Sequence, residues 1–321
     1  MPRHVSVTTG ARLHFGPLSY RPDSGRHFGG VGLMIDQPGV RLTFAESDVD
    51  RVTGDPRGVE RVRTFVARIR ESCLDAVPRP CHIDVQSVVP PHSGLGSGTQ
   101  LGLAVARGLA EFAGEPGVSS VTLAKRVGRG LRSAVGVYGF ETGGLIVDAG
   151  QHDDEEIGAL ACRLAVPDEW RVLLITPPVA DDGLSGAEEE QAFVRLGSMP
   201  LSLTNELSRL VLTELLPAVT AGDLDAFSAA VYEYGSRVGQ FFSRVQGGTF
   251  GNRSTDKLVA HIRNQGVTGI GQTSWGPTLF TFARNESHAR QIISSLPLDI
   301  SPIDIRTTAP LNQGANIVLN K

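Results

Sequence analysis

Three alternating glycines in a proline-bounded loop constrain this chain most strongly, because glycine readily adopts backbone conformations that bulkier residues avoid. Before the loop, Ile83 and Val85 alternate with polar residues, as in a half-buried strand that the paired prolines end. After it, apolar residues fall on one helical face at Leu101, Ala104, Val105, Leu109 and Phe112. The loop itself is Pro90-Pro91-His92-Ser93-Gly94-Leu95-Gly96-Ser97-Gly98-Thr99-Gln100. The sequence therefore predicts a strand, a glycine-rich loop and a helix in direct succession.

This loop is suited to hold a phosphate group. Its glycines permit an anion to approach the backbone closely, and the first turn of the following helix has N–H groups without backbone partners. The segment is neither a Walker loop nor a GxGxxG fingerprint. A short isolated match is equally typical of a loop that only begins a helix. We predict that phosphate is bound by Ser93, Gly94, Leu95, Gly96, Ser97, Gly98 and Thr99.

The remaining pattern predicts an α+β protein with two domains. A chain of 321 residues exceeds the roughly 250 residues that one hydrophobic core usually serves. Its 38 glycines and 19 prolines indicate many tight turns rather than a helical bundle. We place the boundary near Pro167, after an acidic, turn-like run, so that the domains are 1–167 and 168–321.

Apolar periodicity predicts the elements of each domain. In the first we expect strands at 5–8, 40–44 and 144–149, helices at 58–71 and from Ser119 onwards, and a glycine turn at 29–32. In the second we expect an acidic flexible segment at 180–190, helices at 204–216, 224–238 and 286–295, and strands at 172–176, 267–270, 278–282 and near Ile303 and Ile317.

Charge and composition exclude several classes of protein. The formal net charge is −4 with interspersed signs, so no basic stripe indicates nucleic acid as a partner. Cys73, Cys81 and Cys162 have no CxxC spacing, so neither a disulfide framework nor a thiolate zinc site is expected. No stretch approaches the roughly 20 apolar residues that a membrane-spanning helix requires. We expect a cytoplasmic protein that binds a small molecule.

Three motifs together resemble those of one enzyme superfamily. The loop is similar to the phosphate loop of the GHMP superfamily of small-molecule kinases, whose usual form is PxxxGLGSS. Segment 128–148, GRGLRSAVGVYGFETGGLIVD, resembles one branch of it, the β-ribofuranosylaminobenzene 5′-phosphate synthase family. Segment 271–278, GQTSWGPT, is similar to the GQSSWGPT signature of that branch. The resemblance spans nearly the whole chain, including Arg12, His14 and Trp170.

The resemblance implies a two-domain GHMP kinase-like fold, with a left-handed βαβ crossover in the N-terminal domain, a ferredoxin-like C-terminal domain and a cleft between them. It implies an enzyme that condenses phosphoribosyl pyrophosphate with 4-aminobenzoate, on the way to tetrahydromethanopterin. Carbon dioxide and pyrophosphate are released, and a ring carbon is joined to C1 of the ribose. Mg²⁺ as cofactor and a homodimer are further expectations from the resemblance.

One departure from the superfamily favours a synthase over a kinase. The kinases typically read SGxD in the second motif, where the aspartate can accept a proton from the attacking hydroxyl. This chain reads Ser133-Ala134-Val135-Gly136, and Gly136 has no side chain that could act as a base. Loss of carbon dioxide rather than a proton requires no base there. An ATP-dependent kinase of a small alcohol or sugar, and an inactive ligand-binding relative, remain the alternatives.

Charged and polar residues outside the loop are candidates for the substrate site. Arg12 and Arg26 can each bind a phosphate or a carboxylate, although a solvated surface arginine is the simpler interpretation. His14 can donate to a phosphate oxygen or can be an ordinary strand residue. Glu141 can hold Mg²⁺ through its oxygens or can bond backbone groups in a turn.

The tryptophan motif supplies the remaining candidates. Trp275 can stack on the aromatic substrate or can occupy the core, and Gln272 and Ser274 are polar donors beside it. We therefore predict that Arg12, His14 and Glu141 are catalytic, that Glu141 binds the metal, and that Arg26, Gln272, Ser274 and Trp275 bind substrate.

Overall fold

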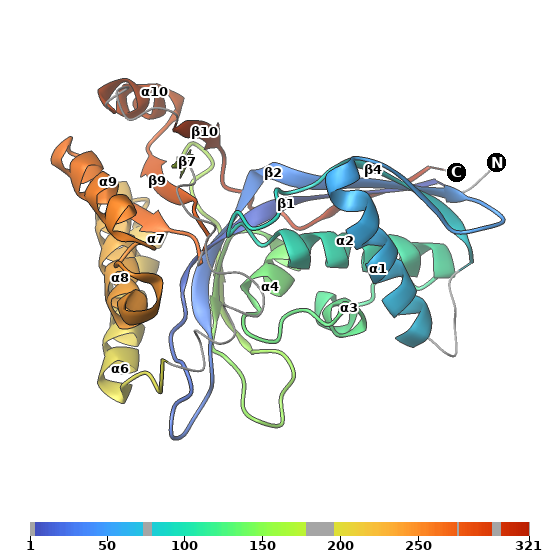
Figure 1. The fold of residues 1–321 in the computed structure, drawn as a ribbon, viewed down its shortest axis with the longest axis horizontal. Helices are drawn as coiled ribbons and strands as arrows, with labels where there is room; N and C mark the ends of the chain where they lie inside the picture. The colour runs from blue at the N-terminus through green and yellow to red at the C-terminus, as the bar shows by residue number, and fades with distance from the viewer. Residues whose placement is uncertain (1–3, 73–78, 178–195, 275, 297–302, 321) are drawn as a thin grey trace.

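The computed structural model describes residues 4–72, 79–177, 196–274, 276–296 and 303–320 (Figure 1). These residues form two sheets, each with its own layer of helices. The predicted acidic segment at 180–190 and Trp275 lie outside the described residues. None of the described helices is long and apolar enough to cross a membrane.

The first sheet has seven strands, and most of it is antiparallel. Its main path runs in the order β11-β1-β2-β4-β3, and β2 also pairs with β5, which pairs with β6. The parallel pair β3 and β4 is joined by helix α1, which makes a βαβ unit. The strands are β1 (His4–Gly16), β2 (Gly30–Glu46), β3 (Arg51–Gly54), β4 (Cys81–Ser87), β5 (Leu145–Asp148), β6 (Leu160–Leu164) and β11 (Asn316–Asn320).

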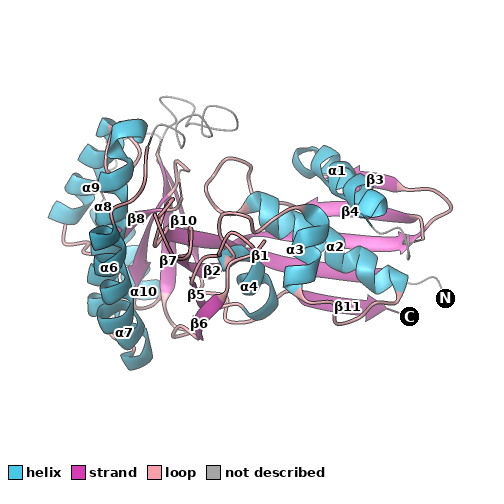
Figure 2. Ribbon diagram, turned by 90° about the horizontal axis from the view of Figure 1, so that it is seen from below, coloured by secondary structure: helices cyan, strands magenta, loops and turns pink. Residues whose placement is uncertain are grey.

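Four helices cover one face of this sheet (Figure 2). They are α1 (Pro56–Ser72), α2 (Ser97–Ala113), α3 (Ser120–Val127) and α4 (Val135–Thr142). Helix α2 lies at the centre of this layer, because it packs against β1, β2 and the other three helices. The predicted strand, glycine loop and helix at 83–112 are confirmed by β4 and α2, and the helix predicted after Ser119 is confirmed by α3.

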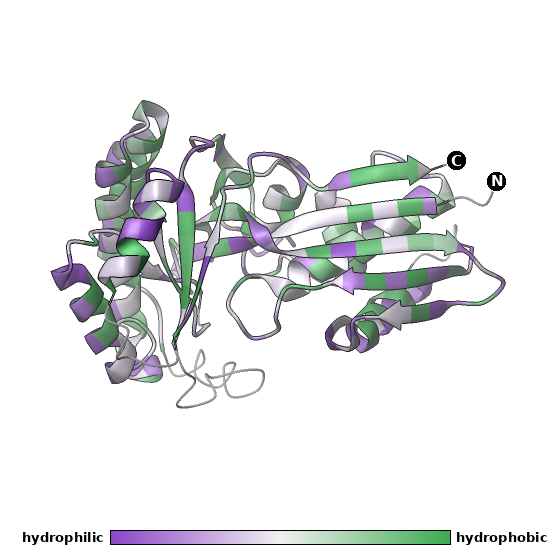
Figure 3. Cartoon of the chain, turned by 90° about the horizontal axis from the view of Figure 1, so that it is seen from above, coloured by the Kyte–Doolittle hydropathy of each residue, from purple (hydrophilic) through white to green (hydrophobic). Residues whose placement is uncertain are grey.

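Alternation along the strands explains how this sheet buries one face. In β1 the side chains of Val5 and Val7 are buried, whereas Ser6 and Thr8 are half-exposed. Figure 3 shows the same change between apolar and polar residues along the neighbouring strands, on the side away from the helices. The helix layer therefore covers the apolar side of the sheet, as the period of two predicts.

The second sheet has four strands in the order β10-β7-β9-β8. Along the chain its elements follow a strand–helix–strand–strand–helix–strand pattern, so the predicted ferredoxin-like domain is confirmed. Its strands are β7 (Arg171–Thr176), β8 (Ile270–Gln272), β9 (Leu279–Ala283) and β10 (Asp304–Thr308). Its helical elements are α6 (Leu201–Leu210), the π-helical turn η1 (Val211–Leu215), α7 (Leu216–Ala221), α8 (Leu224–Gln246), α9 (Arg253–Asn264) and α10 (Glu286–Ser295).

Several predicted elements differ from the structure. Strand β11 pairs with β1, so the strand predicted near Ile317 joins the first sheet and not the sheet of β7 to β10. Gly30 and Gly32 begin strand β2 instead of forming a turn, because they pair with β5. Helix α9 was missed, although its Asn252 side chain caps the first turn. The strand predicted at 267–270 begins only at Ile270, which places Gln272 at a strand end.

The contact between α2 and β2 generates a stability prediction. Gly108 of α2 lies so close to Phe44 of β2 that an added Cβ would overlap the ring. We expect Gly108→Ala to lower the free energy of unfolding by about 1–3 kcal/mol through overpacking. This loss outweighs the gain of up to about 1 kcal/mol that alanine brings to a helix interior. Urea denaturation measures the change.

Gly235 of α8 is the matched control, because the nearest atom to an added Cβ there is 4.0 Å away. Gly235→Ala should leave stability unchanged or raise it slightly. Equal effects at the two positions would contradict the overpacking account.

Candidate functional site

Three distant segments meet at the carbonyl oxygen of Gly94. This oxygen accepts a hydrogen bond from Arg12 Nη1 at 2.7 Å and one from Thr273 Oγ1 at 2.9 Å. Arg12 Nη1 also donates to Ser274 Oγ at 3.1 Å. Strand β1, the glycine loop and the turn after β8 are thus joined at one point, which brings the two domains together.

Glycine is required on both sides of this contact. The backbone of Gly94 has a φ of +77°, and a Cβ on it would lie 2.9 Å from the Cα of Gly276. A Cβ on Gly276 would in turn overlap the backbone of Gly94. The glycine loop and the GQTSWGPT motif are therefore two halves of one packed structure.

The start of α2 has the features expected of an anion-binding loop. Gly96 is the N-cap residue with a φ of +74°, and no side chain caps the helix. The N–H groups of Thr99 and Gln100 bond to the carbonyl of Gly96. Those of Ser97 and Gly98 have no hydrogen-bond partner among the described residues, and they carry the partial positive charge of the helix start.

Two predicted loop residues shape the loop rather than face a ligand. The hydroxyl of Ser93 donates to the carbonyl of Pro90 at 2.7 Å. The side chain of Leu95 is buried in the core, and its carbonyl accepts from the backbone N–H of Arg12 at 3.1 Å. Both residues fix the loop against the sheet.

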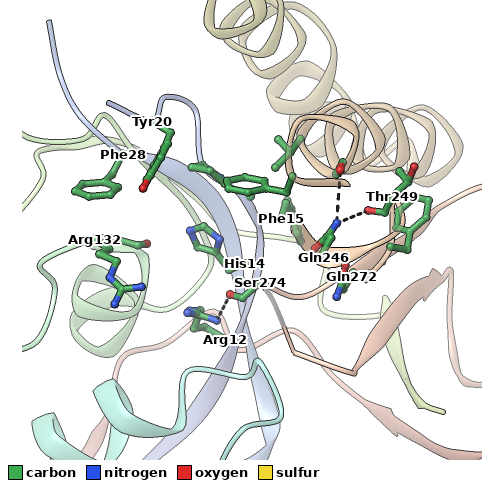
Figure 4. A pocket seen from close by; sticks show the side chains of 18 residues that line it. Arg12, His14, Phe15, Tyr20, Phe28, Arg132, Gln246, Thr249, Gln272 and Ser274 are labelled. Carbon is green, nitrogen blue, oxygen red and sulfur yellow. Dashed lines mark hydrogen bonds between the residues drawn. The ribbon is translucent and has the colours of Figure 1, made fainter. Parts of the chain in front are cut away.

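A cavity of about 240 Å³ lies beside this junction, between strand β1 and helix α8 (Figure 4). Its walls are mostly aromatic and aliphatic, with cationic and polar groups from β1, the segment before α4 and the turn after β8. No aspartate or glutamate is among the described residues that line it. Its lining includes Arg12, His14, Phe15, Tyr20, Phe28, Arg132, Phe242, Gln272 and Ser274.

His14 is a buried donor or acceptor that faces this cavity. The side chain is 7% exposed, and its Nε2 atom has no hydrogen-bond partner among the described residues. Its backbone N–H donates to Thr273 Oγ1 at 3.0 Å. Burial and the neighbouring Arg12 cation lower the pKa of His14 to about 3, so the imidazole is neutral near pH 7. An unpaired buried nitrogen is costly unless a ligand satisfies it.

Arg12 is the cation nearest to the loop. Burial lowers its pKa to about 10, which leaves the guanidinium charged near pH 7. It has no carboxylate within ion-pair distance among the described residues. Its Nη1 atom is occupied by Gly94 and Ser274, but a guanidinium has further N–H donors for an anion. Both Arg12 and His14 thus line the cavity, and their catalytic roles stay predictions.

Two predicted residues lie elsewhere with partners of their own. Arg26 forms an ion pair with Glu155 at 2.5 Å and donates to the carbonyl of Gly150. Glu141 accepts from the backbone N–H of Ser120 at 3.0 Å and from its hydroxyl at 2.5 Å, at the start of α3. Neither lines the cavity. These placements do not support the substrate role predicted for Arg26 or the catalytic and metal roles predicted for Glu141.

The other substrate candidates lie closer together. Gln272 and Ser274 line the cavity, and Gln272 Nε2 also donates to the carbonyl of Gly276 at 3.0 Å. Trp275 lies outside the described residues. Among those that are described, no group of three or more His, Cys, Asp or Glu side chains could hold a metal ion.

Sequence reasoning missed a buried polar link behind the loop. The hydroxyl of Thr9 donates to Gln100 Oε1 at 2.8 Å, and Gln100 Nε2 donates to the carbonyl of Gly136 at 2.8 Å. Gln100 is fully buried, so these bonds fix α2 relative to β1 and α4. A polar residue on the apolar face of a predicted helix was the available signal. Arg132 and Thr273 were also missed, although both lie inside the recognised motifs.

The chain matches two family models. Residues 60–144 match the GHMP kinases N terminal domain, and residues 215–299 match the GHMP kinases C terminal domain. Solved structures with the same fold include mevalonate diphosphate decarboxylase from Staphylococcus aureus, with a TM-score of 0.67, 12% identity and coverage of 99% of this chain and 98% of that one. A homoserine kinase from Cytophaga hutchinsonii has a TM-score of 0.62, 15% identity and coverage of 98% and 97%.

Curated relatives match at higher identity. The β-ribofuranosylphenol 5′-phosphate synthase of Methanothermobacter thermautotrophicus is 30% identical over 97% of this chain and 98% of its own length. The protein of the same name from Archaeoglobus fulgidus is 32% identical over 91% of both chains. The chain therefore belongs to the GHMP superfamily and, within it, to the family of the β-ribofuranosylphenol 5′-phosphate synthases, which are enzymes of the pentosyltransferase type.

Proposed function

We propose that this enzyme joins C1 of phosphoribosyl pyrophosphate to the ring carbon of a 4-substituted benzoate that bears its carboxylate, in the synthesis of tetrahydromethanopterin. The acceptor is 4-aminobenzoate or its 4-hydroxy counterpart, since the relatives are named for a phenol product. The observation that carries the proposal is the cavity itself. It combines aromatic walls with two arginines, and its described lining contains no carboxylate.

The walls suit a planar aromatic acid. Phe15, Tyr20, Phe28 and Phe242 offer ring faces and edges to an aromatic ligand. Arg12 can hold the carboxylate bidentately at the end of the cavity next to Gly96. The reacting ring carbon then lies beside the loop where the phosphates bind. The unpaired Nε2 of His14 is satisfied by an oxygen of either substrate.

The reaction needs no protein base at the ring carbon. That carbon attacks C1, and the C1–O bond breaks with its electron pair leaving on pyrophosphate. The bond to the carboxylate then breaks, its electron pair restores the aromatic ring, and carbon dioxide departs. No proton is taken from the reacting carbon, which agrees with a described cavity lining free of aspartate and glutamate. An ATP-dependent kinase of this superfamily would use a carboxylate near the position of Gly136 as its base.

Gly136 stands at the position of the aspartate in the kinase motif. It is buried, and a Cβ there would be 3.3 Å from Thr99 Cγ2 on the first turn of α2. Asp148, a carboxylate of the same segment, accepts from the backbone N–H groups of Ala134 at 2.6 Å and Gly150 at 2.9 Å. It is therefore engaged in holding the turn before α4.

Mg²⁺ fits this site poorly as a protein-bound ion. The described lining supplies arginine, histidine, hydroxyl and amide groups, whereas Mg²⁺ prefers carboxylate and phosphate oxygens. We propose that any Mg²⁺ is carried by the phosphates of the substrate.

The proposal predicts release of labelled carbon dioxide when the protein is incubated with Mg²⁺, phosphoribosyl pyrophosphate and a carboxyl-labelled acceptor. Parallel incubations with 4-aminobenzoate and 4-hydroxybenzoate identify the acceptor. A third incubation, with ATP and a panel of small alcohols, tests the kinase alternative. Formation of ADP without carbon dioxide would contradict the proposal, and silence in all three would favour an inactive relative.

His14 generates a prediction on the pH dependence of stability. Its folded pKa of about 3 lies below the ordinary value of 6.5, so the unfolded chain takes up a proton that the folded protein excludes. The contribution of this site is fully present above pH 6.5 and decreases by about 1.4 kcal/mol per pH unit below it. We expect His14→Gln to abolish this loss, so that wild type and variant converge by about 1.5–2 kcal/mol between pH 6.5 and 5.

Urea denaturation at several pH values measures this convergence. Parallel pH profiles of wild type and His14→Gln would contradict this prediction, because they would show that folding does not lower the pKa of the imidazole.

A further inference from the structure

Two arginine side chains lie at the first turn of α2, outside the aromatic cavity, and a third lies near one of them. Arg61 of α1 donates from Nη2 to Ser97 Oγ at 3.3 Å. Arg129, which follows α3, lies so that a Cβ on Gly98 would be 3.2 Å from its Cζ atom. Arg68 of α1 packs over Gly128, where a Cβ would overlap its guanidinium. We refer to Arg61, Arg68 and Arg129 as the arginine cluster.

The arginine cluster lacks the counter-charges that its neighbours have. On the same helix, Arg57 pairs with Asp55, Arg63 with Glu60 and Arg70 with Asp50. No member of the cluster has a carboxylate within ion-pair distance among the described residues, and Arg61 Nη1 is buried without a hydrogen-bond partner. Arg61 is half-buried, whereas Arg68 and Arg129 are exposed to solvent. Their like charges lie close together, so a bound anion would relieve a repulsion that water only partly screens.

Electrostatics and packing both reflect this convergence. Burial, together with the charges of Arg61 and Arg68, lowers the pKa of Arg129. The Arg129 guanidinium also lies 5.3 Å from the centre of the Phe65 ring, a cation–π contact that directs it toward α2. Arg61 and Arg129 are therefore held beside Ser97 and Gly98, and Arg68 lies close to Arg129.

The cavity and the arginine cluster are placed to suit the two groups that react at C1, which are the aromatic acceptor and the leaving pyrophosphate. A Cβ added to Gly96 would contact the side chain of Arg12, and a Cβ added to Gly98 would contact the side chain of Arg129. Arg12 and Arg129 thus approach the start of α2 at two different residues. An acceptor beside Arg12 and a leaving group beside Arg129 place the forming and breaking bonds on opposite sides of C1.

We propose that the arginine cluster binds the pyrophosphate group of phosphoribosyl pyrophosphate and stabilises it as it leaves. This inference rests on the proposed function. Three guanidinium groups and the free N–H groups of α2 match the several negative charges of a diphosphate better than they match one carboxylate. When the C1–O bond breaks, the electron pair moves onto the pyrophosphate oxygen, and the cluster compensates this charge.

The test is calorimetric titration of the folded protein with inorganic pyrophosphate and, separately, with ribose 5-phosphate. Arg129→Gln and Arg61→Gln should each raise the Kd for pyrophosphate by about tenfold or more, as expected for loss of a charge-assisted contact. The Kd for ribose 5-phosphate should change by less than about twofold. Melting temperatures confirm that each variant is folded.

Arg63→Gln is the matched control, because it removes the same charge from α1 while its partner is the exposed Glu60. It should leave both constants within about twofold of wild type. Unchanged pyrophosphate binding in folded Arg129→Gln and Arg61→Gln would overturn the proposal. Weakening of ribose 5-phosphate instead would also overturn it, because the cluster would then hold the other end of the substrate.

The outcome does not depend on turnover. If pyrophosphate binding requires the cluster but no carbon dioxide is released from any acceptor, the anion site stands and the proposed transfer reaction falls. If carbon dioxide is released and the cluster variants bind pyrophosphate normally, the reaction stands and the proposed role of the cluster falls.

Discussion

The carbonyl oxygen of Gly94 is the point on which the arrangement of the site depends. It accepts hydrogen bonds from Arg12 on β1 and from Thr273 after β8, so one backbone atom joins the N-terminal strand, the glycine loop and the second domain. Close contact between Gly94 and Gly276 allows this, because a side chain on either residue would occupy the space of the other backbone. The cavity beside the loop and the orientation of Arg12 both follow from this contact.

The residues on the two sides of the Gly94 contact determine which ligands the site suits. On one side, aromatic walls, Arg12 and a neutral His14 suit an aromatic acid. On the other side, the first turn of α2 and the arginine cluster form the place where we propose that pyrophosphate binds. With no carboxylate among the described lining residues, the site is suited to a transfer that loses carbon dioxide more than to one that removes a proton. The same fold serves kinases elsewhere in the superfamily, so the site residues rather than the fold determine the reaction.

Residue patterns within a short stretch of sequence predicted the helices and strands that form through local interactions. The strand, loop and helix at 83–112 and helix α10 follow from periodicity and turn residues. Arg12, His14, Gln272 and Ser274, which were chosen from motifs, all line one cavity. Strand β11 pairs with β1 from the opposite end of the chain, which no local window reveals. Arg26 and Glu141 were assigned by residue type, yet Glu155 and the start of α3 engage them. Whether a charge is free for a ligand depends on its tertiary partners, and these are not visible in the sequence.

The most direct test of the account is the position of the aromatic acceptor in a crystal structure of the protein soaked with the benzoate that supports turnover. The account predicts that the ring lies in the cavity between β1 and α8, among Phe15, Tyr20 and Phe28, with its carboxylate hydrogen-bonded to Arg12. A ring bound outside this cavity, or a carboxylate directed away from Arg12 and the glycine loop, would contradict it.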